Sequence, residues 1–126
     1  MTENELSSSI IGAAIEVHKQ LGGPGLLEDV YEEALCFELV AHGVKVVRQV
    51  QVPVLYKGQL LKKPLFLDLL VEDKVIVEVK AVEKIIPVFN AQLLTYLRLA
   101  GKRLGLLINF GEIRVSEGIH RVVNNL

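Results

Sequence analysis

Two apolar, strand-forming runs in the middle of the chain each contain an acidic residue, and this pattern constrains the fold more than any other. The runs are Leu65–Val71, which contains Asp68, and Val75–Lys80, which contains Glu78. A charge inside an otherwise apolar strand is costly to bury unless it is paired or bound to a metal ion. Because side chains alternate along a strand, Glu78 and Lys80 point to the same face. We therefore expect a hairpin that carries charged groups at a defined place on a sheet.

The length of the loop between these runs decides whether the two carboxylates share a face. A two-residue turn would place Asp68 and Glu78 on opposite faces of the hairpin. A three-residue loop over residues 72–74 instead pairs Val71 with Val75, which sets the two acids directly opposite each other. Such a loop needs a residue near the left-handed region, which aspartate tolerates better than most residues. In this register the two Cβ atoms lie about 5 Å apart, so both carboxylates can bind one cation.

Composition limits the classes of protein to which the chain can belong. Of the 126 residues, 51% are hydrophobic, which predicts one folded domain over residues 1–126 with a substantial core. No apolar run reaches the ~18 residues of a membrane span, and no secretory signal opens the chain. The polar start and the lone cysteine, Cys36, indicate a cytoplasmic protein without an internal disulfide and without a membrane partner.

The charge balance is close to neutral, with 14 basic and 15 acidic residues and a formal net charge of −1. Nucleic-acid binders usually carry a basic surplus, so this balance weakens that class without removing it, because a local patch matters more than the sum. The basic residues of interest lie in the middle and later chain: Lys57, Lys62, Lys63, Lys80, Lys84, Arg98, Lys102 and Arg103. The simpler explanation of this asymmetry is a solvated surface.

The expected order of elements is α-α-β-β-β-α-β, with short strands at the end. Helical periodicity predicts a first helix from a Thr2–Glu5 capping box to about residue 20, a second over residues 27–41, and a third over 88–100 that Pro87 opens. We expect strands over residues 45–55, 60–71, 75–82 and 104–110, followed by one or two short ones among residues 113–115 and 119–123.

Asp68, Glu78 and Lys80 form the candidate chemical site. Mg²⁺ binds few carboxylates together with water, so the two acids and the backbone carbonyl of Val79 would suffice for Mg²⁺ or Mn²⁺. Lys80 would then orient the attacking water or stabilise charge on a pentavalent phosphate. The alternative is a structural Glu78–Lys80 bridge on a solvent-facing sheet, and the acid-x-Lys spacing alone favours neither interpretation.

Two helices add polar residues that could complete such a site. Glu28 and Tyr31 lie one turn apart near the start of the second helix, where Glu28 could add a third acid or simply favour the helix N-terminus. Gln92, Thr95 and Tyr96 interrupt the apolar stripe of the third helix, which suggests a face that looks onto a site. An ordinary amphipathic boundary is the alternative.

Several segments, in order, resemble the GxxExxY proteins, a group of small bacterial and archaeal proteins. The signature segment is Gly25-Leu26-Leu27-Glu28-Asp29-Val30-Tyr31, and the resemblance covers nearly the whole chain. The other segments that carry it are residues 10–18, 78–84, 91–97 and 104–110. One departure is Phe89-Asn90, where members of the family often have His-Glu, and this loss could weaken a supporting polar network.

The resemblance implies membership of the PD-(D/E)XK nuclease superfamily. The fold it implies is an α/β (α+β) single domain with a restriction-endonuclease-like α-β-β-β-α-β core, an extra N-terminal helix and short C-terminal strands. It implies that Asp68 and Glu78 are metal ligands and that Lys80 is the catalytic lysine. It also implies that Glu28 is the acid of the first helix of the core, which is the second helix of this chain. Gln92 is then the polar residue of the second helix of the core, which is the third of this chain.

Three functions are compatible with these features. The leading one is a Mg²⁺- or Mn²⁺-dependent endo- or exonuclease of DNA repair or defence, with Tyr31 and Tyr96 supporting the site. The second is a catalytically weak or inactive module that binds nucleic acid or protein and has kept the nuclease fold. The third is a phosphohydrolase of small molecules, in keeping with the low net charge. A homodimer through exposed terminal strands and a separate protein partner both stay open.

Overall fold

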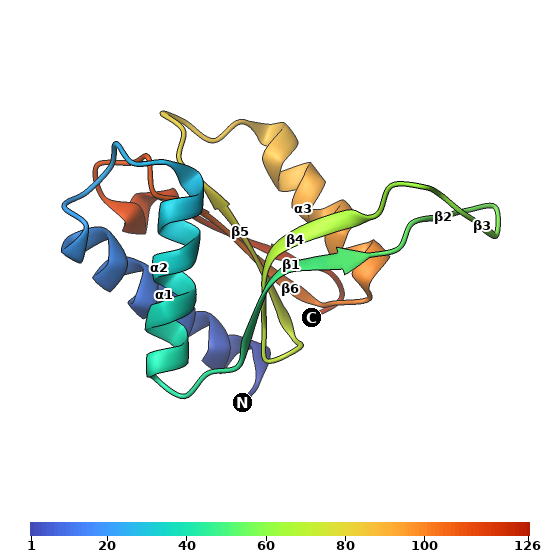
Figure 1. Cartoon of the computed structure of the whole chain (residues 1–126), viewed down its shortest axis with the longest axis horizontal. Helices are drawn as coiled ribbons and strands as arrows, with labels where there is room; N and C mark the ends of the chain where they lie inside the picture. The colour runs from blue at the N-terminus through green and yellow to red at the C-terminus, as the bar shows by residue number, and fades with distance from the viewer.

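The computed structural model describes all residues, 1–126, as three α-helices, one short 3₁₀ helix and seven strands (Figure 1). In chain order the elements are α1 (Glu3–Gln20), α2 (Glu28–Ala41), β1 (Val46–Val52), β2 (Leu55–Tyr56), β3 (Gln59–Leu60), β4 (Leu65–Val71), β5 (Val75–Lys80), α3 (Pro87–Ala100), β6 (Leu104–Asn109), η1 (Val115–Gly118) and β7 (Ile119–Val123). None of the helices combines the length and the hydropathy that a membrane crossing requires.

Five of the strands form one mixed sheet in the order β1-β4-β5-β6-β7, and β2 and β3 form a separate two-stranded sheet. All neighbours in the large sheet are antiparallel except β5 and β6. Parallel strands need a crossover connection, and α3 supplies it between β5 and β6. The resulting α+β architecture agrees with the fold class that the sequence predicts.

The sheet is covered by helices on both faces (Figure 1). On one face, α1 and α2 pack over a core that includes Val77 and Val79 of β5. On the other face, Leu93 of α3 packs over a smaller core that includes Ile76 of β5. Because side chains alternate along β5, Glu78 belongs to the same face as Ile76, which is the face that α3 covers.

The β4–β5 hairpin has the longer of the two loops considered from the sequence. Val71 pairs with Val75, and the pairing of the two strands continues from there to Leu69 with Val77. Both Glu72 and Asp73 take left-handed backbone angles, with φ of 51° and 56°. Of the two alternatives left open by the sequence, the structure therefore has the three-residue loop, in which two residues, and not one, adopt the left-handed conformation.

Two strands predicted as continuous are interrupted at prolines. The predicted strand over residues 45–55 divides into β1 and β2 around Pro53, and that over residues 60–71 divides into β3 and β4 before Leu65. Proline has no N–H for a ladder bond, and it restricts the residue that precedes it. Pro53 and Pro64 thus separate the small β2–β3 sheet from the large one. The strand predicted to end at residue 82 ends at Lys80.

The strand predicted at residues 113–115 is wrong. The chain there leads into η1, and Val115 is buried against the core beneath α1. The physical reason lies in the sheet itself, because β6 is already paired with β5 on one side and with β7 on the other. No edge of β6 is left for an additional strand. The edge strand predicted at residues 119–123 is present as β7.

Candidate active site

β4 and β5 separate at the point where their acidic residues lie. Beyond the Leu69–Val77 pair, the Val79 N–H donates to Asp68 Oδ2 at 2.8 Å, and the Asp68 N–H donates to Glu78 Oε1 at 3.4 Å. Each acidic side chain therefore bonds to the backbone of the opposite strand, in place of the regular ladder. We call this place, formed by Asp68, Glu78 and Val79, the fork.

Glu78 is the most perturbed acid in the protein. Its side chain lies within the sheet, with only 6% of the residue exposed. Burial raises the pKa of the Glu78 carboxyl from 4.5 to about 9, and the negative charge of Asp68 adds to the effect, while the Lys80 ammonium opposes it. Both burial and a like charge disfavour the ionised form of a carboxyl group. Glu78 is therefore protonated at neutral pH when no cation lies at the fork.

Lys80 lies two residues beyond Glu78 but does not form an ion pair with it. None of the salt bridges of the protein involves Lys80. The Lys80 ammonium instead lies 4.6 Å from the centre of the Phe89 ring, at the start of α3. A cation over an aromatic face is attracted by the ring quadrupole. The structural Glu78–Lys80 bridge is thus not the arrangement that the protein adopts.

Glu28 begins α2 and lies within electrostatic range of the fork. Partial burial raises the pKa of its carboxyl, the nearby Lys80 ammonium lowers it, and the charges of Asp68 and Glu32 raise it further. These influences place Glu28 in the same charged neighbourhood as Asp68 and Lys80. No hydrogen bond or ion pair links Glu28 to either of them.

Tyr31 is not part of the fork. Its ring is fully buried and stacks on Phe110, with the ring centres 4.7 Å apart. Its hydroxyl donates to the Gly23 carbonyl at 2.7 Å and accepts from the Leu26 N–H at 3.2 Å. Tyr31 therefore holds the glycine-rich loop to the start of α2, and it makes no hydrogen bond to Asp68 or Glu78.

The polar residues of α3 differ in how closely they approach Asp68 and Glu78. Tyr96 is half-buried, and the pKa of its hydroxyl is raised by burial and by the charges of Glu78 and Asp68. Gln92 is exposed one turn earlier and makes no hydrogen bond to Glu78. The Thr95 hydroxyl donates to the Ala91 carbonyl of its own helix at 3.1 Å. Of these residues, Tyr96 is the one that the structure brings close to the acids.

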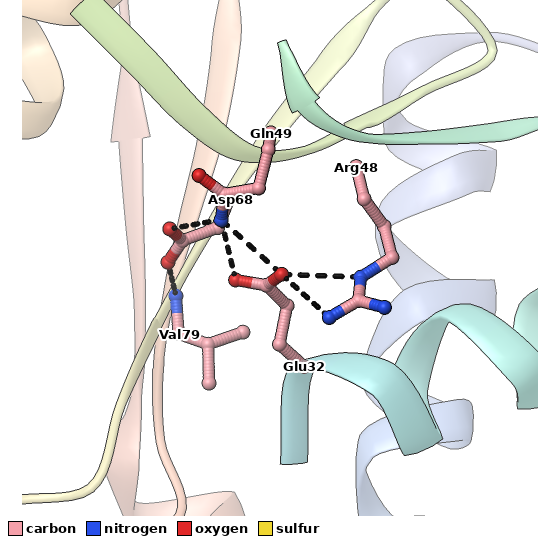
Figure 2. Close-up of polar contacts among 5 residues, drawn as sticks. All are labelled: Glu32, Arg48, Gln49, Asp68 and Val79. Atoms are coloured by element: carbon pink, nitrogen blue, oxygen red, sulfur yellow. Dashed lines mark hydrogen bonds and ion pairs between the residues drawn. The ribbon is translucent and has the colours of Figure 1, made fainter. Parts of the chain in front are cut away.

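A second polar network, which the sequence analysis missed, adjoins the fork (Figure 2). Glu32 of α2 is buried, with 5% exposed, and accepts hydrogen bonds from Arg48 Nε at 3.1 Å and from Gln49 Nε2 at 3.0 Å. Gln49 Nε2 also lies 3.4 Å from Asp68 Oδ1. Burial raises the pKa of the Glu32 carboxyl, and the Gln49 and Arg48 side chains oppose that rise. Gln49 thus bridges an acid on a helix and an acid on a strand.

Gln49 has an uncommon backbone conformation for a strand residue. Its φ is 51°, in the left-handed region, and the register of β1 with β4 places it across from Asp68. For a residue other than glycine, this backbone conformation costs roughly 1–2 kcal/mol. Glu32 could have been found by its spacing, because it is four residues after Glu28 and on the same helix face. The conformation of Gln49 has no signal in the sequence.

The oxygen atoms at the fork are of the kind that bind a small divalent cation. No three His, Cys, Asp or Glu side chains converge on one point, so an ion would depend on Asp68, Glu78, a backbone carbonyl and water. Mg²⁺ typically takes one or two carboxylates and keeps several waters. The N–H and C=O of one strand residue point to the same edge, so the Val79 carbonyl points to the edge on which its N–H meets Asp68.

Residues 4–122 match the sequence model of the PD-(D/E)XK nuclease superfamily, which is almost the whole chain. The three helices and mixed five-stranded sheet are consistent with the restriction-endonuclease-like core of that superfamily, so the fold expected from the sequence is confirmed. Nucleases of this type typically use divalent metals. Neither a curated protein nor a solved structure gives a significant match.

Proposed function

Because the chain belongs to the PD-(D/E)XK nuclease superfamily, we propose that it is a metal-dependent nuclease that hydrolyses phosphodiester bonds at the fork. The observation that carries the proposal is the contact of Asp68 with Glu78 in a nearly buried place, where Glu78 has a raised pKa. Two adjoining acids disfavour each other's charge, and a divalent cation would reverse that effect. We further propose one domain over residues 1–126, membership of the GxxExxY group, and DNA as the substrate.

In this proposal Asp68, Glu78 and the Val79 carbonyl hold Mg²⁺ or Mn²⁺. Such an ion lowers the pKa of a bound water and neutralises charge on the phosphate. The protein's own contribution is to keep the carboxylates on neighbouring strands, and the 2.8 Å bond from the Val79 N–H fixes the orientation of Asp68. Gln49 holds the other Asp68 oxygen from β1. Asp68 is thus oriented on both sides before any ligand arrives.

Lys80 supplies positive charge on the same face as Glu78. Its ammonium rests over Phe89 and is not neutralised by an ion pair, so it remains available to a phosphate oxygen or an attacking water. Glu28 lies nearby, and the Lys80 ammonium lowers the pKa of the Glu28 carboxyl. Tyr96 and Gln92, which are one turn apart on α3, present a hydroxyl and an amide on the side from which a substrate would approach.

A second candidate function is a module that keeps the fold but binds without cleaving. The supporting observation is that the acids are satisfied without a cation, because no buried side-chain nitrogen or oxygen lacks a hydrogen-bond partner. A protonated Glu78 beside Asp68 is a self-sufficient structural pair. A phosphohydrolase of small molecules would need a cavity at the candidate site residues. The cavity of about 690 Å³ between α1 and α2 is lined by none of them, so this function has less support.

Calorimetric titration of Mg²⁺ and Mn²⁺ tests the nuclease proposal directly. We expect binding to the natural chain and its loss, by on the order of 100-fold or more in affinity, in Glu78→Gln. Cleavage of a labelled oligonucleotide should be lost in the same variant. The matched control is Glu83→Gln, an exposed acid three residues after Lys80, which should change neither property.

Two results would decide against the nuclease. One is the absence of metal binding by the natural chain, both alone and with an oligonucleotide present. The other is metal binding that survives in Glu78→Gln, because the ion would then lie elsewhere. In the first case the protonated Asp68–Glu78 pair would be structural, and the binding module would be the better description.

A further inference from the structure

The β2–β3 hairpin is a folded arm that projects from the rest of the chain (Figure 1). Leu55 pairs with Leu60, and Tyr56 pairs with Gln59, so the strands are joined by a two-residue turn. Both turn residues, Lys57 and Gly58, have positive φ values of 50° and 79°. Turns of this kind match the right-handed twist of the flanking strands. We call residues 53–64 the arm.

All the charged side chains of the arm are basic. Lys57, Lys62 and Lys63 lie in it and are exposed, and no acidic residue occurs between residues 49 and 67. The chain as a whole has a net charge of −1. A local basic patch on a nearly neutral chain is the electrostatic footprint of an anionic partner.

The arm also exposes large apolar side chains. The exposed fractions are 63% for Leu55, 60% for Tyr56 and 67% for Leu60. Cross-strand pairing places Leu55 and Leu60 on one face and Tyr56 with Gln59 on the other. A two-stranded hairpin with no packing partner is only marginally stable in water, so this surface gains by being covered.

The arm leaves the large sheet close to the fork. β4 begins at Leu65, three residues before Asp68, which corresponds to about 10 Å of extended strand. β5 is antiparallel to β4, and beyond the Leu69–Val77 pair the two strands diverge, so that Asp68 lies where β4 continues toward the arm. A long ligand that lies along the arm can therefore also reach the fork.

We propose that the arm binds the phosphate backbone of a nucleic acid and holds it across the fork. The lysines contact phosphates, while Tyr56 and the leucines contact sugars or bases, as apolar side chains do when they enter a groove. A two-stranded ribbon has the width that a major groove admits. The occupant is not a second arm, because that would bring the same three lysines of two copies together. The inference rests on the proposed function only for the statement that the bound strand reaches the fork.

Fluorescence anisotropy in EDTA tests the arm without cleavage. The probes are a labelled DNA duplex and the corresponding single strand, at salt concentrations between about 50 and 200 mM. The variant is Lys57→Gln, Lys62→Gln and Lys63→Gln together. The matched control removes three exposed positive charges elsewhere: Lys19→Gln, Lys45→Gln and Arg114→Gln. Melting curves verify that both triple variants are folded.

We expect the arm variant to bind at least about 10-fold more weakly at low salt. Its salt slope should shrink by about 0.9 for each phosphate that the substituted lysines no longer neutralise. The control should stay within about 2-fold of the natural chain. Tyr56→Ala should weaken binding to the single strand, since stacking on a base is worth about 1–3 kcal/mol.

Three results of the binding measurements would overturn the proposal. They are no binding of either probe by the natural chain, equal loss of binding in both triple variants, and an arm variant that binds as tightly as the natural chain. A mass by light scattering that falls from dimer to monomer in Leu55→Ser with Leu60→Ser, with DNA binding unchanged, would assign the arm to a second copy and also overturn it.

The outcomes separate this proposal from the nuclease. Arm-dependent binding without metal-dependent cleavage keeps the arm and removes the nuclease. Cleavage that depends on Glu78 but is insensitive to the arm variant, together with unchanged binding, keeps the nuclease and removes the arm.

Discussion

The two ends of the β4–β5 hairpin are built on opposite principles. The closed end is the one beside the loop over residues 72–74. There Leu69, Val71, Val75 and Val77 are fully buried, and their backbones follow a regular antiparallel register. The open end is the fork. There the side chain of Asp68 accepts the hydrogen bond of the Val79 N–H in place of a backbone carbonyl, and Glu78 is buried beside Asp68. The closed end adds apolar burial and stabilises the fold, whereas the open end gives up regular pairing for polar groups. Such a place is where a functional site is expected.

The largest expected difference between the two ends is in stability. Leu69→Ala at the closed end should lower the free energy of unfolding by about 2–5 kcal/mol, because it removes buried packing and leaves a cavity. Phe66→Ala, on the same strand but exposed, should change it by less than about 1 kcal/mol. Urea denaturation measures both. Equal losses would mean that the closed end is not the stabilising part of the hairpin.

The next effect concerns pH and belongs to the open end. The pKa of Glu78 is about 9 in the folded protein and 4.5 when unperturbed, so between these values the folded state holds a proton that the unfolded state has released. The free energy of unfolding should therefore fall as pH rises from about 5 to 9 in the presence of EDTA. For the same reason the affinity for Mg²⁺ should rise over this range.

Glu78→Gln isolates this contribution from those of Glu28 and Glu32, whose pKa values are also raised. Glutamine resembles the protonated acid and does not titrate, so the pH dependence of thermal melting should be flatter in the variant. A natural chain and a variant with parallel stability curves would show that Glu78 does not carry a proton in the folded state.

A smaller effect is expected where α3 meets the open end. Phe89→Ala removes the ring beneath the Lys80 ammonium, an interaction worth about 0.5–2 kcal/mol. If Lys80 acts on the phosphate, kcat should fall by about 2- to 30-fold while the Kd for substrate changes little. Phe89→Tyr should retain most of the activity, and Phe37→Ala, an exposed ring on α2, should have no effect.

Phe89→His has a separate use, because the resemblance to the GxxExxY proteins leads us to expect histidine at this position. A variant with full activity would mean that an imidazole can take over the role of the ring beside Lys80. A loss as large as that of Phe89→Ala would mean that the aromatic face itself is needed. No change in kcat for any substitution of Phe89 would show that its contact with Lys80 is incidental.

Much of the hairpin could be predicted from the sequence, because local rules determine it. Alternation along a strand and the tolerance of aspartate for left-handed angles reduced the register to two alternatives, and the structure has the one that pairs Val71 with Val75. The breaks at Pro53 and Pro64 could also have been predicted, since proline interrupts a ladder, but the apolar runs around them concealed the signal.

The remaining parts of the site depend on contacts between segments far apart in the sequence. Lys80 reaches Phe89 only because α3 folds back over the sheet, and Glu32 reaches Gln49 only because α2 packs beside β1. No periodicity in any one segment reports such meetings. The roles proposed for Asp68 and Glu78 stay predictions until metal binding is measured.

The smallest effect concerns the backbone of Gln49, and it requires a matched pair of variants. Both Gln49→Gly and Gln49→Ala remove the amide that contacts Glu32 and Asp68, so each should reduce metal affinity or activity. Only glycine adopts φ near 51° without a steric penalty. Gln49→Gly should therefore be more stable than Gln49→Ala by about 1 kcal/mol in urea denaturation. Equal stabilities would mean that β1 relaxes when the amide is removed, and that the hydrogen bonds to the two acids are what hold Gln49 in its left-handed conformation.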